Sequence, residues 1–181
     1  MKNLLGMDGS MRIKGSLGGM YGDLFLELRK RKSPRTVNRY RDLAKERIPQ
    51  PTQQGVESFL HGAGEGKALE LYDRLSRLLI ASDILLLVCP THNFGAPSAM
   101  KAYIDHVVRY RITFAFDPQS GYRGLLTGER AYLISCMGDQ GAQGHQLEPF
   151  EAYLHRVLNF IGIQDIETIP IQGQKNILRT E

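Results

Sequence analysis

The chain has 181 residues, of which 42% are hydrophobic and 23% charged, and its formal net charge is +4. This composition is ordinary for a globular protein, and the length suits a single domain over residues 1–181 with a hydrophobic core. No run approaches the roughly 18 apolar residues of a membrane span, and the N-terminus turns polar and glycine-rich too early for a signal peptide, so we expect a cytoplasmic protein without a membrane partner.

Short apolar runs alternate with amphipathic stretches along the first half of the chain. A helix over Ser16–Lys32 is predicted by apolar residues at spacings of three and four, namely Leu17, Met20, Tyr21, Leu24 and Leu28. The elements around it are a strand over Asn3–Asp8, a loop over Gly9–Gly15, an edge strand over Thr36–Tyr40, a weakly patterned segment over Pro49–Gly66 and a helix over Lys67–Ile80. Ile84–Cys89 is apolar throughout, which is typical of a strand buried on both faces of a parallel sheet.

The second half predicts a helix over Ser98–Tyr110, a loop or small hairpin around Phe114, Phe116 and Gly121, a strand over Arg130–Ser135, a loop over Gly138–Gly144, a helix over Gln146–Phe160 and a strand over Ile166–Ile171. This alternation predicts a three-layer α/β sandwich around a five-stranded parallel sheet. Right-handed crossovers suit the strand order 2-1-3-4-5, with a ligand at the carboxyl ends of the strands beside the switch point. We expect a final helix to be short or missing.

Two further features have plain structural explanations. Basic residues gather between Arg29 and Arg47, but no DNA- or RNA-docking motif accompanies them, so we favour an exposed helix end, loop and edge strand over a nucleic-acid surface. Cys89 and Cys136 lack zinc spacing, which predicts buried free thiols and no metal site. A catalytic thiol at Cys136 is disfavoured, because no second cysteine or base adjoins it in the sequence.

The loops after the first, third and fourth strands are expected to converge on one ligand. In the first loop, the hydroxyl groups of Ser10 and Ser16 can donate hydrogen bonds. The amides of Leu17 and Gly18 follow at the helix start, where unpaired N–H groups and the helix dipole favour a phosphate. No G-x-x-x-x-G-K-[ST] or G-x-G-x-x-G motif is present. A purely structural interpretation, with Ser16 as helix cap, stays equally open.

In the second loop, Thr91, His92, Asn93 and Phe94 can contact the edge of a flat heterocycle, with Phe94 offering an apolar face. The structural alternatives are a core position for Phe94 and an exposed loop position for His92. Glycines in the third loop, Ser135–His145, let the backbone approach a ligand closely, or they simply form a flexible surface loop.

The segment PTHNFGAPSAMKAYID, residues 90–105, resembles the P-x-[YH]-N-F-x-x-P-x-x-[LM]-K-x-x-[IF]-D signature of the FMN-dependent NADH:quinone oxidoreductases, also called azoreductases. The similarity continues through ITFAFDPQSGYRGLLTGERAYLISCMG to FIGI at residues 160–163, and at the N-terminus it depends mainly on Ser10 and Ser16. The resemblance implies a flavodoxin-like fold and an FMN cofactor. NADH or NADPH would reduce the flavin, which would pass two electrons to a quinone or azo compound by ping-pong hydride transfer.

The resemblance also implies site residues. It assigns the FMN phosphate to Ser10, Ser16, Leu17 and Gly18 and the lining of the isoalloxazine ring to Thr91, His92, Asn93 and Phe94. The residues that would close the flavin from the side of the fourth predicted strand are Cys136, Met137, Gly138 and Asp139. The family forms homodimers with sites at the interface, which places Phe116 near the open face of a flavin as a substrate-binding residue. No catalytic side chain is required, although His92 could tune protonation because its ordinary pKa is about 6.5.

This chain departs from the family pattern at several of these positions. Gly18 replaces the second serine of an S-x-S pair, which removes a phosphate hydrogen bond worth about 1.5–3 kcal/mol. His92 replaces the commoner tyrosine, and Cys136 and Met137 replace a polar residue and a glycine. The alternatives are a related reductase of nitroaromatics or metal chelates, an FMN-binding electron carrier, which the basic charge disfavours, and a protein that keeps the fold without a cofactor.

Overall fold

The computed structural model describes residues 2–12, 15–53, 55–57, 67–137 and 149–172. Its central sheet has five parallel strands in the order β2-β1-β3-β6-β7, which are β2 (Val37–Asp42), β1 (Asn3–Asp8), β3 (Ile84–Pro90), β6 (Arg130–Cys136) and β7 (Asp165–Ile171). Counted within this sheet, the order is the predicted 2-1-3-4-5. The α/β fold is therefore confirmed.

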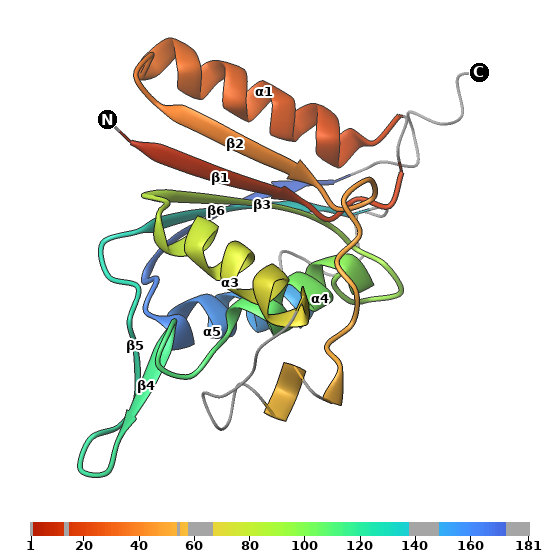
Figure 1. The fold of residues 1–181 in the computed structure, drawn as a ribbon. Coiled ribbons are helices and arrows are strands. Elements are labelled where there is room, and N and C mark those ends of the chain that lie inside the picture. Colours follow the sequence, from red (N-terminus) through yellow and green to blue (C-terminus); the bar gives the residue numbers. More distant parts are fainter. Residues whose placement is uncertain (1, 13–14, 54, 58–66, 138–148, 173–181) are drawn as a thin grey trace.

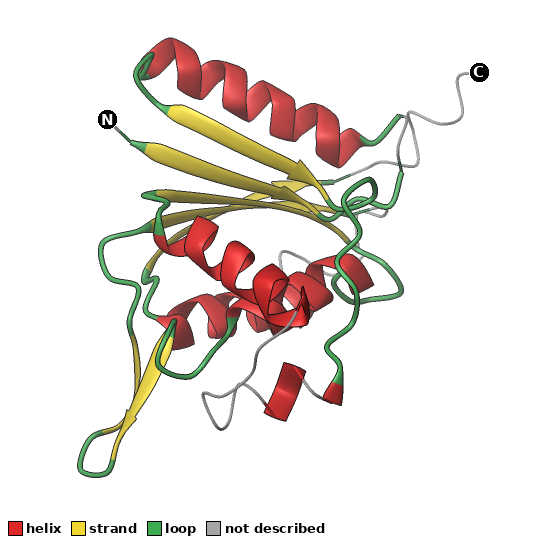
Figure 2. Cartoon of the chain, in the orientation of Figure 1, coloured by secondary structure: helices red, strands yellow, loops and turns green. Residues whose placement is uncertain are grey.

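Helices cover both faces of the sheet (Figures 1 and 2). α1 (Leu17–Lys32) lies on one face, and α3 (Lys67–Ile80), α4 (Ser98–Val107) and α5 (Pro149–Ile161) lie on the other. None of the described helices is long and apolar enough to cross a membrane. The loop predicted over Gly138–Gly144 and the segment after Gln172, where a final helix would follow, lie outside the described residues.

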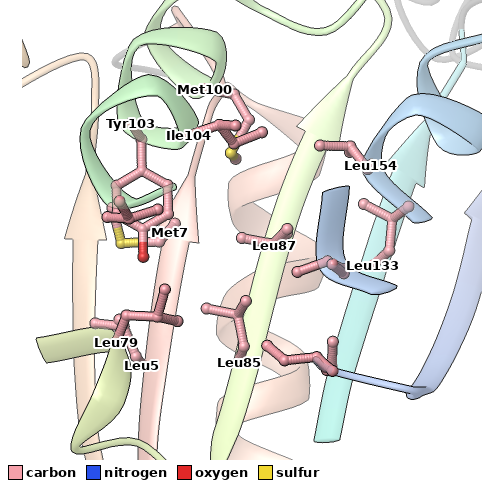
Figure 3. Packing of buried hydrophobic residues seen from close by; sticks show 14 of the residues in the cluster. Leu5, Met7, Leu79, Leu85, Leu87, Met100, Tyr103, Ile104, Leu133 and Leu154 are labelled. Carbon is pink, nitrogen blue, oxygen red and sulfur yellow. The ribbon is translucent and has the colours of Figure 1, made fainter. Parts of the chain in front are cut away.

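The central strand β3 is buried along almost its whole length, as its apolar run predicts. One of its faces packs with the helices α3, α4 and α5, and Figure 3 shows Leu85 and Leu87 of β3 among side chains from these helices and from β1 and β6. Complete burial of one such leucine stabilises the fold by about 1.5–3 kcal/mol. Cys89 and Cys136 are buried free thiols, as predicted.

α1 lies where it was expected, but three of the five apolar residues that predict it are exposed, whereas Tyr21 packs against the core. Met20, Leu24 and Leu28 are 54%, 46% and 49% exposed, whereas Gly18 and Gly22 are buried against the sheet. A Cβ atom on Gly18 would lie only 2.9 Å from Cγ1 of Val88 on β3. The close approach that these glycines permit, rather than the apolar spacing, therefore decides which face of α1 is buried.

The end of α4 also differs from the sequence prediction, whereas the small hairpin that follows it agrees with one of the two expected forms. α4 ends at Val107, earlier than Tyr110, because the Thr113 hydroxyl donates to the Val107 carbonyl at 2.8 Å and also accepts from the Arg109 amide at 2.8 Å, which turns the chain. The segment after this turn forms the antiparallel hairpin of β4 (Phe114–Asp117) and β5 (Gly121–Gly124).

Candidate functional site

The turn between β1 and α1 forms a set of hydrogen-bond donors that we call the anion cradle: Ser10, Ser16 and the first-turn amides of Leu17 and Gly18. Ser16 is the N-cap of α1, and its Oγ accepts from the Gly19 amide at 3.0 Å. The Ser16 hydroxyl donates to Ser10 Oγ at 2.8 Å, so the two serines meet as the sequence suggests. The capping role of Ser16 is confirmed, and it does not compete with ligand binding, because a helix cap lies beside the unpaired amides that favour an anion.

The hydrogen-bond pattern leaves Ser10 as a donor. Its Oγ already accepts from the Ser16 hydroxyl at 2.8 Å and from the Arg12 amide at 3.3 Å. A hydroxyl oxygen that accepts twice still has its own proton to donate. The Ser10 proton is therefore available to an anion at the start of α1.

The buried carboxylate of Asp8 holds the backbone of the anion cradle through a hydrogen bond from the Ser10 amide, and sequence reasoning missed it. Asp8 is only 6% exposed; its Oδ1 accepts from the Ser10 amide at 2.8 Å, and its Oδ2 accepts from the Tyr40 hydroxyl of β2 at 3.0 Å. Burial raises the pKa of Asp8 above its usual value, although the hydrogen bonds from Ser10 and Tyr40 oppose this shift. One sequence signal was available, because a glycine inside a strand often marks the close approach of another group. Gly6 of β1 is such a residue: a Cβ there would lie 2.5 Å from Cδ2 of Tyr40.

The loop after β3 forms a tight turn at the carboxyl end of this strand. His92 and Gly95 exchange backbone hydrogen bonds of 2.9 and 3.0 Å, which places Asn93 and Phe94 at the two central positions with φ of 49° and 64°. These positive angles are those of a type I′ turn. A bulky residue such as phenylalanine is strained in this region, and such strain is typical of functional sites.

The side chains of this loop are available to a ligand. Phe94 is 83% exposed, so it does not fill the core, and His92 is exposed as the structural alternative suggested. The Thr91 hydroxyl oxygen is buried and has no hydrogen-bond partner among the described residues. Because an unsatisfied buried hydroxyl is destabilising by about 1–3 kcal/mol, a ligand that accepts from it or donates to it would relieve that cost.

The end of β6 lies beside the same loop, since the Thr91 amide donates to the Cys136 carbonyl at 2.9 Å. Cys136 is 1% exposed, and burial raises the pKa of its thiol to about 12. Burial therefore favours the protonated thiol, which is a poor nucleophile. Met137 is half-buried, its amide donates to the Ile171 carbonyl at 2.8 Å, and Gly138 and Asp139 lie outside the described residues.

Phe116 does not join the other candidates within one chain. It lies on the β4–β5 hairpin, which projects from the end of the domain opposite the carboxyl ends of the parallel strands (Figure 1). It is 48% exposed and packs against Tyr122, with ring centroids 5.0 Å apart. The described residues contain no group of three or more His, Cys, Asp or Glu side chains that could hold a metal ion.

Comparisons with known proteins agree with this architecture. The sequence matches a family model described as a flavodoxin-like fold over residues 2–181. It is 41% identical over 177 residues to an FMN-dependent NADH:quinone oxidoreductase of Xanthobacter autotrophicus, covering 92% of this chain and 84% of that protein. It is 35% identical over 178 residues to FMN-dependent NADH:quinone oxidoreductase 3 of Pseudomonas aeruginosa, covering 96% and 83%.

Solved structures show the same fold. An azoreductase from Bacillus anthracis superposes with a TM-score of 0.87 at 22% identity, over 98% of this chain and 90% of that chain. An FMN-dependent NADH-azoreductase from the same species, solved in complex with FMN, gives a TM-score of 0.84 at 23% identity, over 97% and 89%.

Proposed function

The chain belongs to the flavodoxin-like fold family whose model it matches over residues 2–181, and from this premise we propose that it is an FMN-dependent NADH:quinone oxidoreductase that reduces quinones and azo compounds. The observation that carries the proposal is the meeting of two features at the carboxyl ends of neighbouring strands. The anion cradle follows β1, and the strained, exposed turn of Asn93 and Phe94 follows β3.

The described residues fit FMN. The phosphate would accept hydrogen bonds from the Ser10 hydroxyl and the amides of Leu17 and Gly18 at the positive end of α1. Ser16 would join them only by turning its proton away from Ser10 Oγ, to which it donates in the free site. A serine at position 18 would add a donor, but its Cβ would lie only 2.9 Å from Cγ1 of Val88. The ring would meet the unpartnered Thr91 hydroxyl.

The other proposed ring contacts come from two segments, the loop after β3 and the end of β6. His92, Asn93 and Phe94 would line it from the loop after β3. Cys136, Met137, Gly138 and Asp139 would lie on the side of β6.

In this proposal the protein binds and orients the flavin and the acceptor, and no side chain has to react covalently. When bound, FMN supplies two-electron hydride chemistry between a nicotinamide donor and the acceptor. The amides of α1 would hold the phosphate, and Phe94 would offer an apolar face against which a flat acceptor stacks. The neutral Cys136 thiol takes no part in proton transfer. His92 is exposed and could exchange a proton with the acceptor; an unchanged pH–rate profile in His92→Phe would eliminate that role.

We further propose a cytoplasmic homodimer, with NADH or NADPH as donor, in which Phe116 of one protomer lies near the flavin of its partner. The support is an exposed aromatic cluster in which Phe116 and Tyr122 of the projecting hairpin, 48% and 65% exposed, adjoin Phe160 of α5, 37% exposed. Exposed apolar clusters of this kind mark interaction surfaces. Phe116→Ala should lower turnover without loss of bound FMN.

The test is a visible spectrum of the protein mixed with FMN and desalted, recorded before and after NADH or NADPH and again after a quinone. A flavin spectrum that bleaches with the nicotinamide and recovers with the quinone supports the reductase. Flavin that stays oxidised indicates an electron carrier instead, and the absence of retained flavin contradicts both. Riboflavin is the matched control ligand, because it lacks the phosphate that the anion cradle would hold.

A further inference from the structure

Asp8 lies against the same helix turn that forms the anion cradle. Its Oδ2 is 3.1 Å from the position that a Cβ atom on Gly19 would take, and Gly19 is in the first turn of α1. Its Oδ1 accepts from the amide of Ser10, whose hydroxyl belongs to the cradle. The carboxylate and a bound phosphate would therefore share the favourable potential of one helix N-terminus.

The charges around Asp8 leave its negative charge poorly compensated. Tyr40 of β2 donates a hydrogen bond, but Asp42 of β2 and Asp23 of α1 are like charges that raise the pKa of Asp8. Lys45, which follows β2, is paired with Asp42 at 2.8 Å and attracts Asp8 only as a smaller contribution, and the Cys136 thiol of β6 is neutral. No ion pair with Asp8 occurs in the part of the chain that the structure describes.

We propose that Asp8 competes with the FMN phosphate for the N-terminus of α1, so that FMN binding takes up a proton on the Asp8 carboxylate and becomes tighter as the pH falls. This inference rests on the proposed function, which places the phosphate at the cradle. A second negative charge in a partly buried turn disfavours the first, whereas a neutral carboxyl group still accepts the Ser10 amide. The coupling is reciprocal: whatever factor protonation adds to FMN affinity, FMN adds to the proton affinity of Asp8.

Asp8→Asn is the direct test, because asparagine keeps the size of the side chain and an acceptor oxygen for the Ser10 amide. At pH 8 we expect this variant to bind FMN about tenfold more tightly than wild type, within the range of ordinary coupling between sites. Riboflavin affinity should not change, since riboflavin carries no phosphate. Asp83→Asn is the matched control: Asp83, like Asp8, accepts a backbone amide beside β1, from Asn3 at 2.7 Å, but at the amino end of the strand, so FMN affinity should stay near the wild-type value.

Proton uptake gives a readout that a merely structural role would not move. Calorimetric titration of wild type with FMN, in buffers of different ionisation enthalpy between pH 5 and 8, counts the protons taken up, and Asp8→Asn corrects for ionisation of the phosphate itself, whose pKa is about 6. Tyr40→Phe removes the hydrogen bond that lowers the pKa of Asp8, so the midpoint of the pH dependence should move upward.

The outcomes separate this inference from the proposed function. FMN binding without proton uptake, or an Asp8→Asn variant that binds FMN equally or less tightly, would overturn the role of Asp8 and leave the oxidoreductase standing. If Asp8→Asn does not fold, wild-type proton uptake and the midpoint in Tyr40→Phe decide the question in the same way. Absence of FMN binding at every pH would overturn both.

Discussion

The turn at Asn93 and Phe94 offers a test in which stability and activity should move in opposite directions. Phe94 has φ of 64° and is 83% exposed, so the residue is strained and buries little apolar surface in return. We expect Phe94→Gly to stabilise the fold and to weaken the enzyme, because glycine adopts positive φ freely but removes the aromatic face.

The size of the effect follows from two opposing contributions. A side chain in the left-handed region destabilises the folded state by about 1–2 kcal/mol. Replacing the side chain by glycine removes this destabilisation, but the greater freedom of glycine in the unfolded chain lowers the stability by about 0.5–1 kcal/mol. The net stabilisation should be about 0.5–1 kcal/mol, which raises the melting temperature of a domain of this size by about 1–4 °C.

Phe94→Ala is the matched control, because alanine removes the ring but keeps the Cβ atom that causes the strain. Thermal unfolding of both variants without flavin should show a gain only for Phe94→Gly, whereas NADH:quinone turnover should fall in both. The reasoning fails if Phe94→Gly melts no higher than Phe94→Ala, or if either variant keeps full turnover.

Three other predictions concern packing, titration and capping. Gly18→Ala should destabilise the fold by about 1–3 kcal/mol by overpacking, whereas Gly95→Ala, whose Cβ would meet nothing closer than 3.7 Å, should be tolerated in urea unfolding. Burial lowers the pKa of His106 below 6.5, so the unfolded chain takes up a proton first and stability should be lost as the pH falls below about 6.5; unfolding of His106→Phe should lack this component, and an unchanged slope would refute it. Ser16→Ala should lower both FMN affinity and stability, the latter by about 1 kcal/mol for a lost cap, whereas Ser10→Ala should lower chiefly FMN affinity; equal melting temperatures for the two variants would contradict the capping role.

The fold was predictable because its strongest sequence signal is local. The unbroken apolar run of β3 indicates a strand buried on both faces. The helical periodicity of α3 and α5 indicates helices that alternate with the strands along the chain. With right-handed crossovers, this alternation leaves few strand orders, and the predicted one is present. The pairing of Ser10 with Ser16 was accessible in the same way, since both residues belong to one short loop.

Asp8 and Tyr40 were not accessible in this way. They are 32 positions apart, and they meet only because β1 and β2 pair in parallel with Gly6 opposite Tyr40. The orientation of α1 is a similar case. Apolar spacing indicates Met20 and Leu24 as inward residues, yet close contact with β3 turns the glycine face inward instead.

The sequence by itself determined most secondary elements, the order of the sheet and the loops that carry the candidate site, because hydrophobic periodicity and turn residues act between near neighbours in the chain. Only the tertiary structure decided that Phe94 stands in solvent on a strained turn, that Phe116 lies far from the cradle of its own chain, and that a buried carboxylate lies under the start of α1. Burial, strain and charge compensation depend on which distant segments are brought into contact, and one-dimensional patterns do not contain that information.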